Sequence, residues 1–391
     1  MAEVVIVGGG IIGAACASEL ARRGMSVTLI ERDNLAAHAS GRNQGLWVIP
    51  SEDATIPMAL FSLRSYLDLA PAAPIDVQLD PEPVGLVLVA RDDDEIAAGL
   101  AKVTVAERAG ARVDSLDSAA ARDVEPALAE GFAAAWMVHH GHRLDPGALT
   151  LALALDAREH GATIRHHLNA RALFQRDDGV GGVVTDEGVL EADFTLVAAG
   201  PWSGALLDPV GVRLPIVGAR GWLVRVAPPP GLVRHLVEAA GPHAALRGEA
   251  ASRRPTAGDV AARGFPGSDL GAIVHPHRDG TVLVGSSRET WLTPEPDDAT
   301  AVRLLLDAAI GLVPALAEAE VVSSWWGVRP LSPDERPFVG RVGEGLFVAT
   351  GHGSEGVILG AGTAALVASA ILEEDPPFDP VAFAPQRFQE R

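Results

Sequence analysis

The chain has 391 residues, enough for two domains, and its 48% hydrophobic and 21% charged residues are ordinary for a globular protein. Its net charge of −20 argues against nucleic acid as a partner, because phosphate binding requires clustered Lys and Arg. No apolar run reaches the roughly 18 residues of a membrane span, and no charged leader precedes the first apolar run, so we expect a cytoplasmic protein. The single cysteine, Cys16, excludes an intrachain disulfide and a Cys-based metal cluster, and the single lysine, Lys102, makes a Schiff-base enzyme hard to build.

The first stretch, Val4 to Asp33, carries the clearest motif. A short apolar run leads into glycines spaced as GxGxxG, a helical pattern follows, and a second apolar run ends at an acid. The glycines allow a tight turn and close approach of a pyrophosphate, which the helix N-terminus attracts, while the acid accepts hydrogen bonds from ribose hydroxyls and repels a 2′-phosphate. The alternative is a Gly-rich turn without a ligand, and the motif leaves open which dinucleotide is bound. The residues concerned are Gly8, Gly10, Ile12, Gly13 and Glu31.

A polar, Gly-rich segment follows, which is either a solvated loop or a set of donors near a polyanion. Its candidate cofactor-binding residues are Ser40, Arg42, Asn43, Gln44 and Gly45. Together with the opening fingerprint and the pair Glu31–Arg32, this segment resembles the FAD-dependent oxidoreductases of the D-amino-acid oxidase superfamily. That superfamily includes glycine and sarcosine oxidases and the flavin subunits of D-proline, hydroxyproline and opine dehydrogenases. The resemblance implies FAD as the cofactor.

The next elements read as the first part of a second domain. Helical patterns and β-rich runs alternate over Pro57–Leu69, Val84–Ala90, Asp92–Ala109 and Phe132–His139. Three imidazoles, His139, His140 and His142, form either a metal site or a turn with surface side chains. No matching acid spacing accompanies them, which favours the turn.

A helix is predicted from Pro146 to Gly161 with Asp145 as its N-cap. Strand patterns then cover Thr163–His167, Ala172–Gln175, Val180–Thr185 and Phe194–Ala198. The last strand runs into an AAGPWSG segment. There the resemblance implies that Gly200 and Trp202 line the cofactor, while the alternative is an ordinary strand-to-helix turn.

The stretch Val212–Val226 resembles the family's crossing strand into the substrate domain, on which Arg220 and Trp222 either line a substrate cavity or are surface or core residues. Residues 227–267, rich in Pro, Ala, Gly and Arg, read as loop and insertion. A hairpin is predicted over Gly271–Glu289, followed by a helix over Asp298–Leu312. The resemblance implies that the hairpin sits over the flavin. Sarcosine oxidase has an oxygen-activating lysine on the second strand of this hairpin, and no lysine occurs here.

The late segment Ser323–Val342 contains a WxGxRP pattern with Gly327 and Arg329. The resemblance implies that Arg329 binds the substrate carboxylate and that Gly327 lies at the cofactor. A guanidinium suits that task because it is planar, offers paired donors and stays charged when buried. The alternative is an interdomain ion pair.

Gly345–Glu373 reads as a strand, a Gly-rich turn and a long helix, and so mirrors the opening unit. The resemblance implies that the helix N-terminus points at the pyrimidine edge of the flavin, where its positive end favours the anionic reduced form. His352 either contacts the flavin or the substrate or is a hydrogen-bonded structural imidazole. The candidate shell comprises Gly351, His352, Gly353, Ser354, Glu355, Gly356 and Val357.

The function implied is FAD-dependent oxidation of the C–N bond of a small amino acid or secondary amine carrying a carboxylate. A hydride passes to flavin N5 and the imine is hydrolysed, so no dedicated acid–base residue is named. The alternatives are a non-catalytic FAD-binding subunit of a larger complex and, less favoured, a nicotinamide-dependent dehydrogenase. The missing hairpin lysine favours a dehydrogenase with an electron-transfer partner subunit over an oxidase. We expect non-covalent FAD, although His38 lies near the polar segment and histidine attaches FAD in some relatives.

The expected fold is an α/β protein in which a Rossmann-like FAD-binding domain is interleaved with an antiparallel-sheet substrate domain. Residues 1–80, 144–215 and 325–391 are expected to form the FAD-binding domain, and residues 81–143 and 216–324 the substrate-binding domain. Tryptophans can line a substrate cavity, although they are more often core residues. The candidates are Trp47, Trp222 and Trp326.

Overall fold

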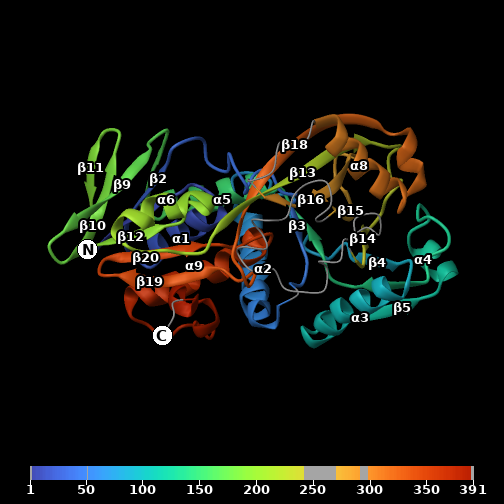
Figure 1. Ribbon diagram of the computed structural model, residues 1–391, viewed down its shortest axis with the longest axis horizontal. Helices are drawn as coiled ribbons and strands as arrows, with labels where there is room; N and C mark the ends of the chain where they lie inside the picture. The colour runs from blue at the N-terminus through green and yellow to red at the C-terminus, as the bar shows by residue number, and fades with distance from the viewer. Residues whose placement is uncertain (1, 51, 242–269, 291–297, 389–391) are drawn as a thin grey trace.

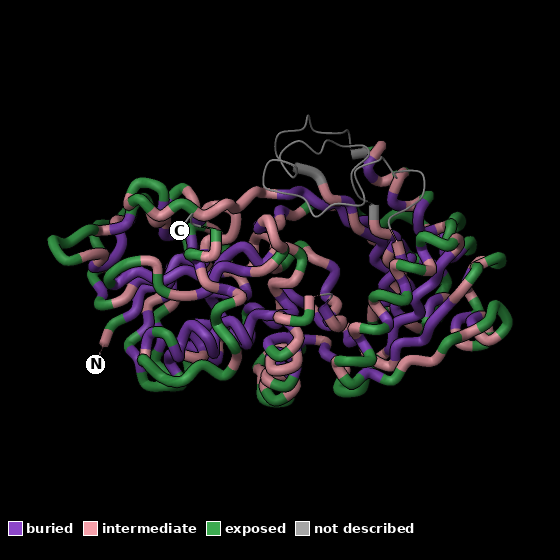
Figure 2. The backbone as a smooth tube through the Cα atoms, turned by 60° about the horizontal axis from the view of Figure 1, so that its bottom comes forward, coloured by how far each residue is buried: buried purple, intermediate pink, exposed green. Residues whose placement is uncertain are grey.

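A computed structural model describes residues 2–50, 52–241, 270–290 and 298–388. The molecule is elongated, with a mainly parallel sheet at one end and an antiparallel sheet at the other (Figure 1). Buried backbone runs through both parts, and exposed residues gather at outer turns and helices (Figure 2). Among the described residues, no helix combines the length and apolar character that crossing a membrane requires, and the cytoplasmic location stays a prediction.

The parallel sheet has the strand order β19-β20-β12-β1-β2-β8, in which only β19 runs antiparallel to its neighbour. The predicted opening unit is confirmed, because β1, α1 and β2 follow one another and β1 pairs in parallel with β2. The strands are β1 (Glu3–Val7), β2 (Ser26–Glu31), β8 (Thr163–His166), β12 (Phe194–Val197), β19 (Phe338–Gly343) and β20 (Leu346–Thr350).

Four helices build the largest hydrophobic core with this sheet. Helix α1 packs against α5 and α9, and α2 packs against α9. Helix α9 is buried on all sides, which explains its apolar sequence. Asp145 caps α5 as predicted, with its Oδ1 accepting from Ala148 N at 2.9 Å. The bounds are α1 (Ile11–Arg22), α2 (Ile56–Leu69), α5 (Pro146–Glu159) and α9 (Gly356–Leu372).

The second sheet has the order β17-β13-β16-β15-β14-β4-β6-β5, and β18 pairs with β13. Apart from the parallel pair β14–β4, its neighbouring strands are antiparallel. The strands are β4 (Leu86–Ala90), β5 (Val113–Leu116), β6 (Ala134–Val138), β13 (Val217–Ala227), β14 (Leu236–Ala239), β15 (Leu270–Pro276), β16 (Val282–Ser287), β17 (Glu289–Thr290) and β18 (Glu320–Leu331).

The two faces of this sheet have different partners. Helix α8 (Asp298–Ile310) packs on the face that carries Trp222, Val224 and Val274. Side chains alternate along a strand, so the opposite face carries Gly221, Leu223 and their cross-strand neighbours. We call this opposite side the site face, because Arg329 lies on it opposite Ala219.

Smaller elements flank the two large sheets. A three-stranded sheet and the two-stranded pair β3–β7 stand apart from the two large sheets. Helix α3 packs near β4, and α4 packs against β5 and β6. The bounds are β3 (Leu46–Trp47), β7 (His142–Arg143), β9 (Ala170–Arg176), β10 (Gly179–Thr185), β11 (Gly188–Glu191), α3 (Asp93–Arg108), α4 (Ser118–Val124) and α6 (Ser203–Leu207).

One sequence prediction is wrong in part. Residues 227–267 were expected to be loop and insertion, but β14 lies within them and pairs with β4 and β15. Four residues flanked by Pro, Gly and Ala carry too little periodicity to identify a strand. Residues 242–269 lie outside the described part of the chain. The parallel sheet draws its strands from the three segments assigned to the FAD-binding domain, but the domain boundaries stay a prediction.

Candidate active site

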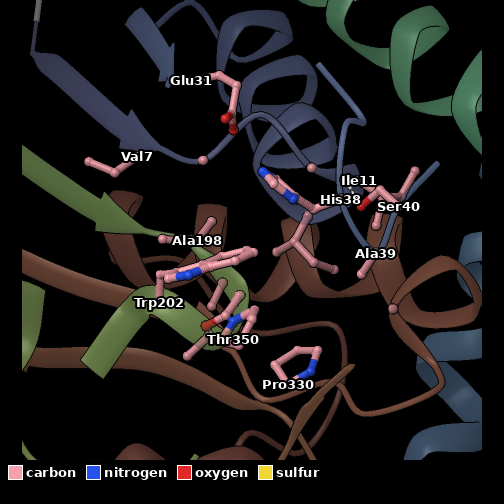
Figure 3. A pocket seen from close by; sticks show the side chains of 18 of the residues that line it. Val7, Ile11, Glu31, His38, Ala39, Ser40, Ala198, Trp202, Pro330 and Thr350 are labelled. Atoms are coloured by element: carbon pink, nitrogen blue, oxygen red, sulfur yellow. Dashed lines mark hydrogen bonds between the residues drawn. The ribbon is translucent and has the colours of Figure 1, made fainter. Parts of the chain in front are cut away.

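A cavity of about 300 Å³ lies at the carboxyl ends of β1, β2, β12 and β20 (Figure 3). In α/β sheets this edge is where ligands bind. Fifteen of the predicted site residues line the cavity, although their separate roles stay predictions. These are Gly8, Gly10, Ile12, Glu31, Arg32, Ser40, Asn43, Gly200, Trp202, Arg329, His352, Gly353, Ser354, Gly356 and Val357.

The first turn requires glycines because its backbone lies close to the backbone of neighbouring segments. A Cβ on Gly13 would lie 1.9 Å from Gly8 O, so no side chain fits between helix and strand. Gly8 has a φ of +118°, and a Cβ there would lie 2.5 Å from Ala198 O. The turn therefore presents bare backbone to the cavity, which a bulky phosphate group requires.

Side chains organise the same turn. Glu31 is buried at the end of β2, where its Oε2 accepts from Gly9 N at 2.7 Å and its Oε1 from Asp33 N at 2.8 Å. Ser40 Oγ accepts from Ile11 N, in the first turn of α1, at 2.8 Å. Each carboxylate oxygen can accept a second hydrogen bond, so Glu31 can still bind two hydroxyls.

The end of the cavity beside Glu31 has an aromatic wall. The guanidinium of Arg32 lies over the Trp202 ring at 4.1 Å, and the His38 ring lies 4.7 Å from the same indole. His38 Nε2 also lies 2.8 Å from Asp33 Oδ2. Glu31, Asp33 and His38 are the one group in the described residues that could hold a metal ion, but these contacts already engage all three.

The second glycine-rich turn lies across the cavity, between β20 and α9. Gly351 and Gly353 have φ values of +80° and +57°, and Gly353 N donates to Pro330 O at 2.8 Å. Within the described chain no side chain caps α9, a helix of 17 residues, and Gly356 in its first turn lines the cavity, so the positive end of the helix lies there. The bond to Pro330 fixes the end of β18 next to this turn.

His352 is a buried, neutral imidazole. It is 2% exposed and its Nε2 lies 3.0 Å from Thr363 Oγ1. Burial lowers its pKa to about 3, so it carries no charge at neutral pH. It lines the cavity and is hydrogen-bonded within the fold, and its contact with flavin or substrate stays a prediction.

Arg329 is held on the site face by a close backbone approach. Its Nη1 donates to Ser287 O at 2.9 Å. A Cβ on Gly221 would lie 1.9 Å from the same nitrogen, so the guanidinium needs a glycine on the neighbouring strand. Arg329 thus reaches the cavity wall from the antiparallel sheet, as its neighbour Pro330 does.

Other predicted site residues do not line this cavity. Trp222 is buried under α8, as the core alternative expects. Arg220 lies on the same face of the sheet as Trp222, and Arg329 lies on the other face. Trp47 is fully buried, with its ring 5.0 Å from that of His140. The remaining residues are Gly13, Arg42, Gln44, Gly45, Gly327, Gly351 and Glu355.

Glu355 lies at the N-cap of α9 without a capping hydrogen bond. Burial raises its pKa to about 8, and the nearby carboxylates of Glu335 and Glu52 act in the same direction. Its Oε2 has no hydrogen-bond partner within the described residues. Glu355 is therefore largely protonated at neutral pH.

The sequence predictions missed several cavity residues. Four of them, Leu168 to Arg171, follow β8, and Pro330 and Thr350 close the other side. Thr350 Oγ1 donates to Gly200 O at 3.0 Å and so ties the ends of β12 and β20 together. No motif marks these residues, because the position of a turn beside a neighbouring strand decides their exposure.

Known proteins match this chain over nearly its whole length. The family model "FAD dependent oxidoreductase" matches residues 3–370. Glycine oxidase from Pseudomonas aeruginosa is 29% identical over 393 residues, covering 98% of each chain. The 4-methylaminobutanoate oxidase (formaldehyde-forming) of Paenarthrobacter nicotinovorans is 28% identical, covering 99% of this chain and 45% of its own. The crystal structure of glycine oxidase from Geobacillus kaustophilus aligns with a TM-score of 0.84 and 27% identity over 100% of both chains.

The cavity fits the cofactor of this family. Bare backbone at Gly8 suits a pyrophosphate, the carboxylate of Glu31 suits a ribose, and the exposed end of α9 suits an anionic ring edge. The fold class and the predicted FAD cofactor are confirmed. The chain belongs to the DAO family of FAD-dependent oxidoreductases.

Proposed function

We propose that this enzyme oxidises the C–N bond of a small primary or secondary amine that carries a carboxylate. The observation that carries the proposal is the Arg329 guanidinium in the wall of the FAD cavity, beside the turn that leads into α9. The matched relatives named glycine oxidase and 4-methylaminobutanoate oxidase act on amines of this class, as their names state.

The chain's own residues hold and orient the reactants. Gly8, Glu31 and the first turn of α1 line the cavity and would hold the diphosphate and ribose, and the N-terminus of α9 would face the flavin ring. Bound FAD supplies a hydride acceptor at flavin N5. Arg329 pairs with the substrate carboxylate and thereby aims the α-hydrogen at the ring, so catalysis rests on positioning. The imine product is hydrolysed by water.

The neutral His352 ring limits the positive charge of the cavity wall. An imidazole with a pKa of about 3 remains unprotonated, so it adds no second positive charge beside Arg329. Its hydrogen bond to Thr363 fixes the ring. We assign it a positioning role and name no general base.

We propose that FAD is bound without a covalent link. His38 contacts Asp33 and the Trp202 ring at the end of the cavity proposed for the adenosine, away from the end proposed for the flavin ring. Acid precipitation should therefore release the FAD, leaving a colourless protein precipitate and a yellow supernatant. Yellow colour that stays with the precipitate would contradict this.

The electron acceptor is a separate question. The only lysine, Lys102, lies on α3 and pairs with Glu238, so β16 offers no lysine to promote reaction with oxygen. On this ground we propose an acceptor other than oxygen, such as a partner subunit that carries electrons away. The oxidase relatives favour oxygen. Stoichiometric peroxide formed in air by the isolated chain would establish an oxidase.

Arg329 tests the proposed function. We expect Arg329→Met to lower kcat/KM for a carboxylate-bearing amine by about a hundredfold or more, since it leaves a carboxylate unpaired in a buried site. Arg329→Lys keeps the charge but loses the two-pronged donor, so it should recover only part of the activity. Arg303→Met, an exposed arginine on α8, is the matched control. Unchanged turnover in Arg329→Met with bound FAD would contradict the proposal.

A further inference from the structure

Glu355 is an acidic residue beside the cavity that the proposed function does not use. It directly precedes α9 as the N-cap residue, but its carboxyl makes no capping hydrogen bond to the helix. Its sequence neighbours Ser354 and Gly356 line the cavity, whereas Glu355 itself does not. The carboxyl therefore lies behind the cavity wall, at the helix end that the flavin ring would face.

Two other acids lie near Glu355, and each already has an arginine partner. Glu52 precedes α2 and Glu335 lies in the turn between β18 and β19, and both carboxylates oppose a negative charge on Glu355. Arg288 acts in the opposite direction. However, Arg288 Nη1 pairs with Glu335 Oε1 at 2.8 Å, and Arg336 Nη2 pairs with Glu52 Oε2 at 3.2 Å. These arginines are thus balanced by carboxylates other than that of Glu355.

The hydroxyl of Thr55 indicates that Glu355 carries a proton. Thr55 is buried, with its side chain close to the Glu355 carboxyl, and its Oγ1 donates to the main-chain oxygen of Glu52 at 2.8 Å. A hydroxyl has a single proton, so toward Glu355 it can only accept, and the acid must be the donor. Burial raises the pKa of Glu355 to about 8, and its Oε2 has no hydrogen-bond partner among the described residues. The surroundings therefore suit a neutral acid.

A negative charge at this position would oppose the chemistry at the flavin. Hydride transfer gives the ring a negative charge, which the positive end of a helix favours. A carboxylate at the N-cap of α9 would cancel part of that positive end, because its charge lies within the first turn. A neutral carboxyl leaves the helix end as it is.

We propose that Glu355 is a positioning residue that keeps its proton during the reaction and so preserves the positive end of α9 for the reduced cofactor. The inference rests on the proposed function, in which the flavin ring faces the N-terminus of α9. Glu355 touches neither substrate nor cofactor and acts through its charge alone. When the pH rises through about 8, loss of the proton should make the flavin harder to reduce.

The midpoint potential of bound FAD tests this inference without any amine. Wild-type and Glu355→Gln holoenzymes are reduced anaerobically by dithionite in the presence of a reference dye, at pH 6 and at pH 9. We expect equal potentials at pH 6, where both side chains are neutral. At pH 9 the wild type should lie lower by about 20 mV or more, which is about fivefold in the equilibrium of a two-electron couple and is typical of one charge at a helix end.

Two results would overturn the inference. One is equal potentials at both pH values. The other is a difference of the same size at both, because a changed shape of the turn, unlike a titrating charge, acts at every pH.

Glu373→Gln is the matched control, because Glu373 is an exposed acid at the opposite end of the same helix. The 17 residues of α9 span roughly 25 Å at about 1.5 Å per residue. Salt screens exposed charges beyond about 10 Å, so this variant should follow the wild type at both pH values. A shift as large as that of Glu355→Gln would contradict a local effect at the N-terminus of α9.

A second variant decides the question if Glu355→Gln binds no FAD. Glu335→Gln removes one of the carboxylates that raise the pKa of Glu355, so that pKa should fall. The curve of midpoint potential against pH should then bend at a lower pH than in the wild type. A bend at the same or a higher pH would contradict the assignment of the titrating group to Glu355.

These results are separate from those that test the amine. A pH-dependent difference between wild type and Glu355→Gln supports the role of Glu355 even if Arg329→Met turns over carboxylate-bearing amines normally. Equal potentials at both pH values remove the role of Glu355 and leave the proposed oxidation standing.

Discussion

The two parts of the molecule treat buried polar groups in opposite ways. We call the first glycine-rich turn, with Glu31 and Ser40, the cofactor cradle. Its backbone donors are hydrogen-bonded within the protein: Gly9 N donates to Glu31 and Ile11 N donates to Ser40. On the site face, His275 and Gln44 keep polar atoms unbonded in the described structure. The cradle is a prebuilt backbone surface for a constant ligand. On the site face the unbonded polar atoms belong to side chains.

The largest expected effect lies in the cradle. Gly13→Val should leave a protein that binds no FAD or does not fold, because its Cβ would lie 1.9 Å from Gly8 O and backbone cannot move aside cheaply. Gly204→Ala is the control, since a Cβ there meets no atom within 4 Å and alanine suits a helix. Flavin absorbance of the purified proteins measures the difference. A yellow, stable Gly13→Val would refute the close-packing account.

A smaller effect is expected at the ribose position. Glu31→Ala should weaken FAD binding by about tenfold to a hundredfold, because it removes hydrogen bonds to the ribose and leaves Gly9 N and Asp33 N unpaired. Titration of apoprotein with FAD, followed by fluorescence quenching, gives the Kd. Glu191→Ala, an exposed acid on β11, should bind as the wild type does. Equal Kd values for the two variants would remove Glu31 from the cofactor site.

The smallest effect concerns Glu355 and pH. Its pKa of about 8 in the folded chain lies above the usual 4.5, so its contribution to stability is complete below about pH 4.5 and is lost as the pH rises through 8. Glu355→Gln imitates the neutral acid and should raise Tm at pH 9 by about 2 °C or more, with little change at pH 5. Glu187→Gln, an exposed control, should behave alike at both pH values. A Glu355→Gln protein that loses stability at pH 9 would contradict a buried neutral carboxyl.

Local chemistry made the cradle readable from the sequence. The glycine spacing and the Asp145 cap act within a few residues, the acid after the second strand belongs to the same short unit, and the structure has the strands and helices they indicate. Arg329 was identified through its family pattern, and it does line the cavity, although its role awaits the variants above.

The residues of the site face could not be predicted from the sequence, because long-range strand pairing decides which side chains lie on it. Trp222 and Leu223 are neighbours in sequence but point to opposite faces of the sheet, and only the cross-strand register shows which face meets the cavity. His275 was read as part of a plain hairpin. Its full burial beside Gln44, more than two hundred residues earlier in the chain, is a long-range contact that no local pattern shows.

Anaerobic reduction of the flavin tests the central claim most directly. The holoenzyme is mixed, without oxygen, with a broad panel of D-, L- and N-alkyl amino acids and with matched amines that lack the carboxylate, such as sarcosine beside dimethylamine. We expect at least one carboxylate-bearing amine to bleach the flavin about a hundredfold faster than its matched amine, because only the former pairs with Arg329. Equal rates within every pair would contradict the role of Arg329. No bleaching by any member of the panel would contradict the proposed oxidation and support a non-catalytic flavoprotein subunit.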